Sequence, residues 1–386
     1  MKILVVTDEY PWPTRTGYRQ RIAHVVAALA TVAEVDLLSV VLDDAPGRPE
    51  PDATLRRTEV VIGGRNALSR PVRLARWAFG RSPRSLLWRD WTAARDVLTR
   101  LLRDGYDAVW FSHATTFLAL ADLIGAPAIV DLDNLESELL RHQRRVTRSA
   151  ADAVDERRWR RLETRIAGTA RYVVVCSELD RRRLGSANAR VIPNGYDRGR
   201  TPPLRHPAPD PVFLMVGLLT YVPNQDAAVW FAREVFPHVR RELPNARFRV
   251  VGRYGSAEQV APLRDLPGVE VTGEVPDIAV ELAAAHVSVV PVRFGGGTRI
   301  KILEAFARRV PVVTTNVGCE GLDVVSGQQL CIADEAGDFA AACVQLVRDP
   351  EGAARLVAAG EQLWQDAYCW SGIASTLVAL VRETAA

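Results

Sequence analysis

The chain has 386 residues, of which 48% are apolar and 25% are charged, and its formal net charge is +3. Because a globular domain has roughly 150 residues, this length predicts two domains, each with its own core. The composition is that of an ordinary globular protein and excludes a disordered tail, a coiled coil and a collagen-like fibre.

Apolar runs and cysteines indicate the compartment. The first run, Ile3–Val6, ends at Thr7 and is too short for a signal peptide or a membrane span, and no later run reaches spanning length. The five cysteines are odd in number and contain no CxxC pair, which argues against a disulfide framework and a zinc ribbon. We therefore expect a cytoplasmic protein.

Short β-branched runs alternate with helical periodicity along both halves of the chain. This pattern predicts an α/β fold in which parallel strands are covered by helices on both faces. The expected strands are Ile3–Val6, Val35–Val41, Ala108–Phe111, Ala128–Val130 and Tyr172–Val175, then Val212–Val216, Phe248–Val251, Val269–Val271, Val287–Val290 and Val310–Thr314. Two doubly wound sheets follow, with ligands expected outside the carboxyl ends of the strands.

The two halves differ in charge. Residues 1–200 carry 33 Lys+Arg against 25 Asp+Glu, whereas residues 201–386 carry 16 against 21. The six prolines between positions 193 and 211 are typical of an ordered, non-helical linker. We predict a first domain over 1–200, a second over 201–365, and a C-terminal helix over 366–386 that packs back on the first domain.

Residues 56–103, which include an expected strand near Val60, depart from this regular pattern. They hold 12 Arg against 3 acidic residues and include Trp77, Phe79, Trp88 and Trp91. One interpretation is a solvated helical insertion whose Trp rings pack on the domain. The alternative is peripheral contact with a membrane or a lipid-linked acceptor, because basic residues interleaved with Trp suit a membrane interface. Nucleic acid is not an expected partner, because no recognisable reading motif is present.

The segment Val290–Gly321 carries the clearest chemical signal. A strand ending near Val292 is followed by the glycine turn Gly295–Gly297, and Thr298 precedes a helix expected over Arg299–Ala307. Glycine lets the backbone approach a ligand closely. A helix start offers unpaired N–H groups and roughly half a positive charge, so such a turn can bind phosphate.

Two cations and an acid strengthen this interpretation. Arg299 and Lys301 lie in the first helical turn, where the helix dipole disfavours cations, so an anionic partner is implied. Lys301 stands out because the basic residues are 47 Arg and only 2 Lys, which indicates the codon bias of a GC-rich genome. Glu304 lies three residues further on, where a carboxylate can accept hydrogen bonds from a ribose diol. We infer that the second domain binds a phosphorylated ligand.

This segment resembles the nucleotide-sugar-binding segment of the retaining GT-B glycosyltransferases, and of glycosyltransferase family 4 in particular. The resemblance covers nearly the whole chain, more weakly over residues 45–105, through motifs that follow the order of that family. These motifs are Thr16-Gly17 after the first strand, VVCSE at Val174–Glu178, VIPNGYD at Val191–Asp197, LMVG at Leu214–Gly217, RVVG at Arg249–Gly252, VTGEV at Val271–Val275, and Trp370 before a final helix.

The resemblance implies two Rossmann-like domains facing each other across a cleft. A nucleoside-diphosphate sugar would bind the second domain and an acceptor the first, and transfer would retain the anomeric configuration. Residue roles follow: the diphosphate is held by Gly297, Thr298, Arg299 and Lys301 and approached by Gly17, the ribose by Glu304, and the base by the backbone near Glu274 and Val275. No metal or other cofactor is expected, since the helix dipole and cations would stabilise the departing diphosphate.

Two positions depart from the pattern of that family in the donor segment. The acidic residue expected eight positions before Glu304 is replaced by Gly296. After Gly217 the family commonly has an Arg and, several residues later, a Lys that grip phosphate, but the later stretch here, Thr220–Asn224, contains neither. The resemblance therefore shifts the phosphate-binding role to the cations of the glycine turn.

Two residues are candidates for the reacting centre. Asp133 occupies about the place of a histidine often found after the fifth strand, where it could orient an acceptor hydroxyl or take its proton. It could equally cap a helix expected over Asn134–Leu140. His113 follows the carboxyl end of the strand Ala108–Phe111, where a ligand would bind, although a structural histidine is an equal interpretation.

The resemblance thus implies a metal-independent retaining glycosyltransferase whose acceptor is a small molecule, a glycan or a lipid-linked glycan. A nucleotide-sugar epimerase or hydrolase is the enzymatic alternative. A non-catalytic nucleotide-sugar-binding subunit is the other alternative, because Gly296 leaves the donor sugar without its expected carboxylate.

Overall fold

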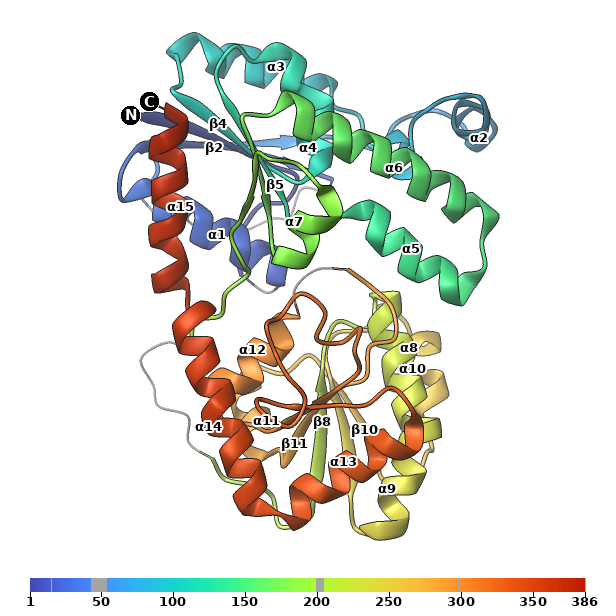
Figure 1. Cartoon of the computed structure of the whole chain (residues 1–386). Coiled ribbons are helices and arrows are strands. Elements are labelled where there is room, and N and C mark those ends of the chain that lie inside the picture. The colour runs from blue at the N-terminus through green and yellow to red at the C-terminus, as the bar shows by residue number, and fades with distance from the viewer. Residues whose placement is uncertain (15, 43–53, 199–204, 297–298, 386) are drawn as a thin grey trace. The chain divides into compact units, whose positions relative to one another are not determined.

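The computed structural model describes residues 1–14, 16–42, 54–198, 205–296 and 299–385, and of residues 145–147 the backbone alone. The chain divides into two compact units. Unit 1 comprises Met1–Asn194 and the segment from Trp370, and unit 2 comprises Gly195–Cys369. Figure 1 labels the elements of each.

Unit 1 contains a parallel sheet of seven strands in the order β3-β2-β1-β4-β5-β6-β7. The strands are β1 Lys2–Thr7, β2 Glu34–Val41, β3 Arg57–Ile62, β4 Ala108–Ser112, β5 Ala128–Leu132, β6 Tyr172–Val175 and β7 Ala189–Val191. The helices are α1 Gly17–Ala30, α2 Arg70–Phe79, α3 Thr92–Leu101, α4 Ala114–Leu120, α5 Glu136–Thr147, α6 Ala150–Thr169, α7 Glu178–Leu184 and α15 Trp370–Ala385.

Successive side chains along a strand point to opposite faces of the unit 1 sheet, and each face packs into its own hydrophobic core. In β1, Ile3 and Val5 join the core formed with α1 and α15, whereas Leu4 and Val6 join the core formed with α3, α4 and α6. The last helix is therefore part of unit 1, where the Trp370 ring stacks on His24 of α1 with ring centroids 4.6 Å apart.

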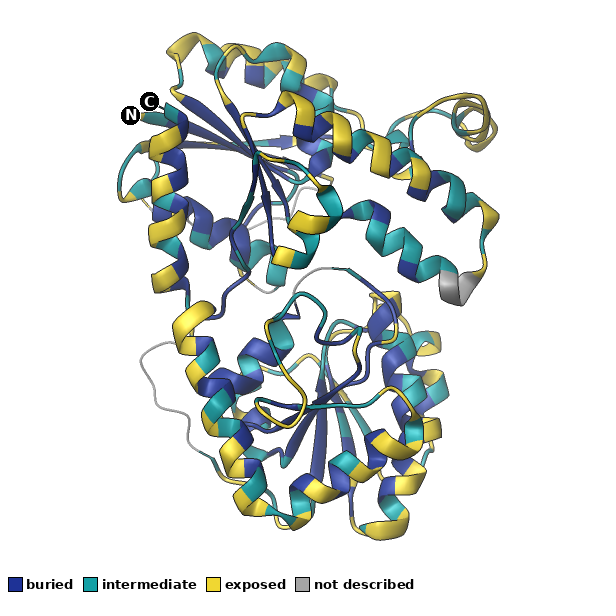
Figure 2. Ribbon diagram, in the orientation of Figure 1, coloured by how far each residue is buried: buried dark blue, intermediate teal, exposed yellow. Residues whose placement is uncertain are grey.

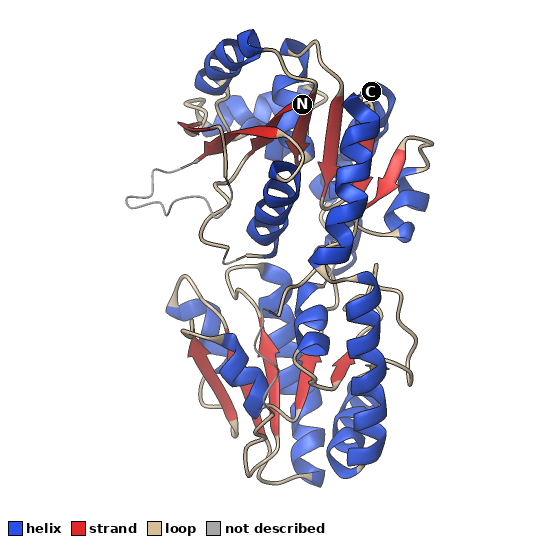
Figure 3. Cartoon of the chain, turned by 90° about the vertical axis from the view of Figure 1, so that its left-hand side faces the viewer, coloured by secondary structure: helices blue, strands red, loops and turns tan. Residues whose placement is uncertain are grey.

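Unit 2 repeats this architecture with six parallel strands in the order β10-β9-β8-β11-β12-β13. The strands are β8 Val212–Val216, β9 Arg247–Val251, β10 Val269–Gly273, β11 Val287–Val290, β12 Val312–Thr314 and β13 Cys331–Ile332. The helices are α8 Val222–Trp230, α9 Phe236–Glu242, α10 Ala257–Val260, α11 Ile278–Ala284, α12 Ile300–Ala307, α13 Ala336–Arg348 and α14 Pro350–Ala367. In each unit the strands lie between layers of helices (Figure 3).

Two doubly wound parallel sheets confirm the predicted fold class. In both, the strand order reverses next to the first strand of the unit: between β1 and β4 in unit 1, and between β8 and β11 in unit 2. Ligands of doubly wound sheets bind outside the carboxyl ends of the strands at such a switch point. The residues that follow these four strands therefore define the candidate sites.

Candidate active site

The carboxyl ends of β1 and β4 bring Asp8 and His113 together in unit 1. His113 Nδ1 lies 3.0 Å from Asp8 Oδ1, and the Tyr18 hydroxyl donates to the same oxygen at 2.5 Å. The Tyr18 ring also stacks on the imidazole, with ring centroids 3.7 Å apart. The Thr115 hydroxyl donates to Asp8 Oδ2 at 3.0 Å. One carboxylate therefore orients a histidine and a tyrosine at the predicted edge of the sheet.

The backbone also fixes the position of His113. This residue precedes α4 with φ 73° and ψ 148°, and its N–H donates to Asp131 O at 2.9 Å. A positive φ is rare for a residue other than glycine and costs on the order of 1–3 kcal/mol, so surrounding contacts must hold it. Such strain concentrates at functional sites, which supports a ligand-binding role for this edge of unit 1.

The charges at this edge favour an ion pair. Burial alone would lower the pKa of His113, but the charge and hydrogen bond of Asp8 raise that pKa to about 9. Burial alone would raise the pKa of Asp8, yet His113, Tyr18 and Arg89 hold it well below its ordinary value. Burial raises the pKa of Glu136, in the first turn of α5, to about 7. At neutral pH the imidazole is therefore protonated.

Asp133 belongs to a polar network under the same edge of unit 1. Arg21 makes two hydrogen bonds to Asp131, at 2.7 and 2.8 Å, and donates to Asn194 Oδ1 at 3.0 Å. Asn194 Nδ2 in turn donates to Asp133 Oδ1 at 2.8 Å, and the Cys176 thiol lies 3.5 Å from that oxygen. The salt bridge between Arg21 and Asp131 is buried, since the Arg21 side chain is 1% exposed and the Asp131 side chain 3%.

The helix-capping interpretation of Asp133 is wrong. The helix expected over Asn134–Leu140 begins at Glu136, its N-cap position is Leu135, and no side chain caps it. Asp133 lies one residue after the end of β5 and is held by Asn194 instead. Its role as an acceptor-binding residue stays a prediction.

Gly17 is the first residue of α1 in unit 1. The Thr16 side chain caps this helix by accepting from the Arg19 N–H at 3.3 Å. The N-terminus of α1 thus lies at the carboxyl end of β1, near Asp8, because Tyr18 binds that carboxylate. The predicted contact of Gly17 with phosphate or acceptor stays a prediction.

In unit 2, Lys301 reaches the loop after β8. Its ammonium donates to Asn224 Oδ1 at 2.7 Å, and Asn224 Nδ2 donates to Leu218 O at 3.0 Å. A Cβ on Gly217 would lie 3.2 Å from the ammonium and 2.7 Å from Asn224 Nδ2, so glycine keeps room for the pair. Lys301 and Asn224 come from the two sides of the switch point, on α12 and α8.

Burial changes the protonation of Lys301 and Glu304. Burial, with a smaller contribution from the charge of Arg299, lowers the pKa of Lys301 to about 7. Burial raises the pKa of Glu304 to about 7, against the opposing effects of a hydrogen bond from Tyr196 and the charge of Arg308. Ionisable groups with pKa values moved towards neutrality are typical of functional sites.

The structure places Arg299 inside the glycine turn. The residue is 6% exposed, and its guanidinium donates to Gly296 O at 2.6 Å and to Val317 O at 3.5 Å. The neighbouring Gly295 has φ 131°, a conformation that favours glycine. Gly297 and Thr298, predicted to hold the diphosphate, lie outside the described residues. Arg299 thus stabilises the turn by donating hydrogen bonds to backbone carbonyl groups, and its guanidinium is enclosed by protein.

Glu274 and Val275 follow the carboxyl end of β10, the edge strand of unit 2. Glu274 is exposed, and Val275 packs against the unit 2 core. Gly273 has φ 77°, and a Cβ there would lie 3.6 Å from the Tyr254 ring. These residues occupy the carboxyl edge of the sheet, two strands away from β8, and their predicted contact with the base stays a prediction.

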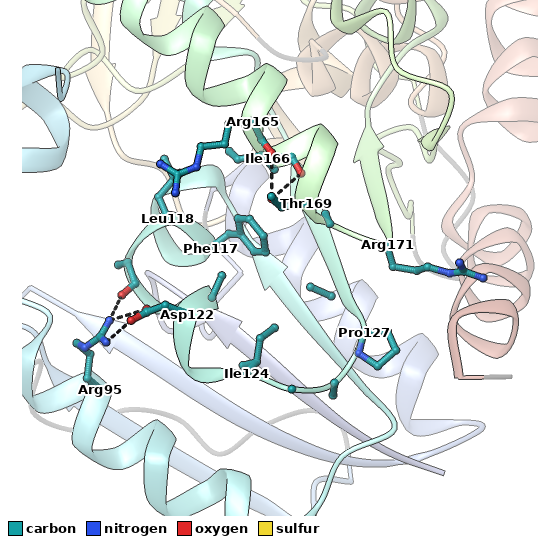
Figure 4. Close-up of a pocket in the computed structure, with 16 residues that line it drawn as sticks. Arg95, Phe117, Leu118, Asp122, Ile124, Pro127, Arg165, Ile166, Thr169 and Arg171 are labelled. Carbon is teal, nitrogen blue, oxygen red and sulfur yellow. Dashed lines mark hydrogen bonds and ion pairs between the residues drawn. The ribbon is translucent and has the colours of Figure 1, made fainter.

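Figure 4 shows a pocket in unit 1 whose lining includes the amino end of β5. It measures about 880 Å³ and is bounded by Pro127 and Ala128 at the amino end of β5, by Phe117 of α4 and by Ile166 of α6. Arg95 at its rim is already paired with Asp122. Because ligands of doubly wound sheets bind at the opposite, carboxyl edge, this hollow is not the candidate site.

The part of the chain that the structure describes lacks both a cluster of metal ligands and a membrane-spanning helix. Within it, no group of three or more His, Cys, Asp or Glu residues is arranged to hold a metal ion. Within the same residues, no helix combines the length and apolar character needed to cross a bilayer.

Sequence reasoning missed Asp8, Tyr18 and Glu136 in unit 1 and Asn224 in unit 2. A signal for Asp8 was available, because it follows the first strand directly, as His113 follows β4. Asn224 carries no comparable signal, since an asparagine at a helix start is common for capping alone.

Comparison with known sequences supports a glycosyltransferase. Residues 210–349, within unit 2, match the family described as glycosyl transferases group 1. The chain is 26% identical to glycogen synthase of Mycobacterium tuberculosis over 405 residues, which covers 97% of this chain and 93% of the relative. An uncharacterised 44.6 kDa protein of the Klebsiella pneumoniae cps region is 28% identical, over 33% of this chain and 34% of that protein.

Comparison with solved structures shows the same fold over the whole chain. Sucrose-phosphate synthase from Thermosynechococcus elongatus superposes with a TM-score of 0.74 at 20% identity, covering 99% of this chain and 98% of that one. Anabaena HepE, solved in complex with UDP and glucose, superposes with a TM-score of 0.71 at 14% identity, covering 99% and 100%. The group 1 match in unit 2, on a fold shared with GT-B glycosyltransferases, supports a GT-B glycosyltransferase as the class of this enzyme.

Proposed function

We propose that the enzyme transfers a sugar from a nucleoside-diphosphate sugar to a hydroxyl or amine acceptor, with retention of the anomeric configuration and without a metal ion. The observation that carries the proposal is the Lys301 ammonium, held by Asn224 at 2.7 Å beside Gly217 at the unit 2 switch point. A half-buried cation next to a glycine backbone at this edge is suited to a phosphate group.

The donor would bind unit 2 through Lys301 and Glu304, which lie three residues apart on α12. Lys301 and the amides of Gly297 and Thr298 would contact the diphosphate. Arg299 contributes by shaping the turn and by its positive charge, since its guanidinium is engaged with two carbonyl groups. Glu304 would accept hydrogen bonds from the ribose hydroxyls, and the backbone near Glu274 would meet the base.

The acceptor would bind unit 1 beside Asp133 and His113. With a pKa near 9, His113 is protonated at neutral pH, so it can donate a hydrogen bond to an acceptor or to an oxygen that gains charge, but it cannot serve as a base. Asp133 can orient the acceptor hydroxyl. Glu136, whose pKa is raised to about 7, is a further carboxylate suited to proton transfer at neutral pH.

Retention fits a front-side reaction in this proposal. The position where the resemblance places a carboxylate in contact with the donor sugar is Gly296, so we assign no protein nucleophile. The departing diphosphate itself would help to deprotonate the acceptor, while Lys301 and the start of α12 stabilise its charge. That assignment of charge stabilisation to protein groups is the reason to propose metal independence.

HepE, a structural neighbour, has been solved with UDP-glucose, so UDP-glucose is the first donor to test. Calorimetry with UDP, GDP and ADP and with their glucose conjugates, in the presence and absence of EDTA, identifies the base and any metal requirement. Donor binding unaffected by EDTA, weakened in Lys301→Ala and unchanged in Lys2→Ala is the expected result. Equal binding by all three proteins would contradict the proposed donor site.

The product then separates the proposal from its alternatives. Proton NMR of the glycosylated product should show the anomeric configuration of the donor. An inverted product would overturn retention. Release of free sugar or an epimer without any acceptor would indicate a hydrolase or an epimerase, and tight donor binding without turnover in any acceptor screen would indicate a binding subunit.

A further inference from the structure

The helix α2 in unit 1 has an apolar face that the rest of the described structure leaves uncovered. None of its ten residues is buried, and the whole helix is exposed or half-buried (Figure 2). Phe79 is 92% exposed, Leu74 60% and Val72 43%. At 100° per residue these three share one side of the helix with Pro71, Ala75 and Ala78. A solvent-exposed apolar face of this kind marks an interaction surface.

The opposite side of α2 attaches the helix to α6. Arg73 and Trp77, four residues apart, are the half-buried positions of the helix. Trp77 Nε1 donates to Asp155 Oδ1 at 2.7 Å, and the guanidinium groups of Arg84 and Arg158 lie over the Trp77 ring at 5.6 and 5.4 Å. Arg158 also donates to the backbone oxygen of Trp77 at 2.8 Å. These contacts hold α2 so that its apolar face points away from α6.

The charges around this face are positive. The segment Arg65–Trp88 contains six Arg and no Asp or Glu. Arg70, Arg76 and Arg81 are exposed and form no ion pair with any described residue. Arg70 and Arg76 lie at the two borders of the apolar face, which is the arrangement of an amphipathic helix in the interface of a membrane.

A second basic feature adjoins the end of α2. A hollow of about 430 Å³ is lined by Gly80 and Arg81 on one side and by α6 on the other. Its α6 wall carries Arg157, Arg161 and Arg165, which are exposed, are spaced four residues apart on one face of the helix, and make no ion pair within the described part of the chain. Such a stripe offers several cations to an anionic head group.

We propose that α2 and the arginine stripe of α6 dock unit 1 on a bilayer that contains anionic phospholipid. The apolar face of α2 would enter the head-group region, and the arginines beside it would contact lipid phosphates. An uncharged apolar partner would not require the arginines, and a nucleic acid would not require Phe79 and Leu74, so an anionic membrane fits both features. The proposal does not depend on the donor chemistry of unit 2.

Vesicle sedimentation tests this proposal with the full chain. Vesicles of phosphatidylcholine alone are compared with vesicles that also contain phosphatidylglycerol, at low and raised salt. The wild type should bind the phosphatidylglycerol vesicles, and raised salt should weaken the binding. Leu74→Ser/Phe79→Ser and Arg157→Gln/Arg161→Gln/Arg165→Gln should each lose about tenfold or more in vesicle affinity.

Val280→Ser is the matched control, because Val280 is an apolar residue that is 65% exposed on α11 of unit 2. This variant should bind vesicles like the wild type. Thermal unfolding checks that all variants fold, which is expected because every changed residue is exposed. Wild-type protein that ignores phosphatidylglycerol vesicles at low salt would overturn the proposal and leave an acidic protein as the partner. Unchanged vesicle binding in both multiple variants would overturn it as well.

Discussion

The two units share a doubly wound sheet topology, but the side chains at their switch points differ in charge. In unit 1, residues after β1 and β4 form a network of carboxylates around protonated groups, with Asp8 beside His113 and Asp131 beside Arg21. In unit 2, residues around β8 and β11 provide glycines and the Lys301 ammonium. A shared strand order therefore fixes where a ligand binds but not what binds, because the side chains that follow the strands set the charge.

The difference also concerns how each site is held. Unit 1 relies on a buried salt bridge, which is costly to assemble and damaging to break. The unit 2 site depends on the space that Gly217 leaves beside the side chains of Asn224 and Lys301, and on Lys301 itself, whose pKa is lowered to about 7 by burial. Substitutions in unit 1 should thus affect stability first, and substitutions in unit 2 should affect ligand binding first.

The largest expected effect is on the stability of unit 1. Arg21→Met keeps much of the side-chain volume but leaves Asp131 buried without its partner. It also removes hydrogen bonds to Asn194 and to the Ile192 carbonyl. Chemical denaturation should show a loss of about 3–5 kcal/mol in the free energy of unfolding.

The matched control is the double variant Arg21→Met/Asp131→Leu, which removes the stranded charge together with the arginine. It should recover part of the lost stability, because an apolar pair of similar volume avoids the desolvation cost. A single variant as stable as the wild type would show that the salt bridge does not support the unit 1 site.

The next largest effect is on catalysis, in unit 2. Lys301→Ala should lower kcat/KM by about a hundredfold, or roughly 3 kcal/mol of transition-state stabilisation, because the diphosphate would lose the half-buried Lys301 cation. Lys2→Ala, which changes the other lysine of the chain, should behave like the wild type. Near-normal turnover of Lys301→Ala would remove Lys301 from the site.

The pKa of Lys301 makes this prediction sharper. Since the free enzyme has a pKa of about 7 there, donor binding above pH 7 must be coupled to uptake of a proton. Between about pH 7.5 and 9.5 the donor affinity should fall, by up to about tenfold per pH unit, whereas Lys301→Ala should lose this slope. Glu304→Gln removes the other nearby titration, and a slope that vanishes in this variant instead would assign the effect to Glu304.

The free energy of unfolding of unit 1 should depend on pH through His113. The folded pKa of His113, about 9, lies above the ordinary value of 6.5, so its contribution is fully present below pH 6.5 and is lost as the pH rises through 9. We expect the wild type to lose on the order of 2 kcal/mol of stability across this range, because solvent screens part of the attraction between Asp8 and the half-buried His113 ring. Asp8→Asn should abolish the loss.

The measurement is an NMR titration of the imidazole together with denaturation at several pH values. In Asp8→Asn the pKa of His113 should fall well below its wild-type value, because burial is then opposed only by the charges of Asp133 and Glu136. Thr92→Ala serves as a control, since its hydroxyl binds Asp90 on the exposed surface of the same unit. An imidazole that titrates near 6.5 in the wild type would refute the ion pair.

The sequence predicted the strands of both sheets other than β7 and β13, because their apolar runs are long enough to recognise. It did not predict β7 or β13, since three and two residues show no periodicity. The glycine turn before α12 was readable for a similar reason, because turn, helix start and cation are neighbours in the chain. Local patterns are visible in a single sequence.

Pairs across a switch point are not local. Asp8 and His113 are 105 residues apart, and Asn224 and Lys301 are 77 apart. Their contact follows from which strands are neighbours, and strand order is not encoded in periodicity. Asp133 shows how a local interpretation can fail. A capping role was reasonable from the neighbouring sequence, but Asn194, 61 residues away, binds Asp133 instead.

The smallest expected effect concerns the space that unit 2 keeps beside Lys301. In Gly217→Ala the new Cβ would meet Asn224 Nδ2 at 2.7 Å and the Lys301 ammonium at 3.2 Å, so these side-chain ends must shift. Stability should change by less than about 1 kcal/mol, because flexible side-chain ends absorb the clash. Donor affinity should fall about tenfold, since the ammonium loses its position.

Gly337→Ala is the matched control for this substitution, because a Cβ at position 337 of α13 meets open space and lies on the same unit. Calorimetry with UDP should separate the two alanine variants while their melting temperatures stay alike. If Gly217→Ala bound UDP as tightly as Gly337→Ala, the position of the Lys301 ammonium would not limit donor binding, and the space beside Gly217 would have no role in the unit 2 site.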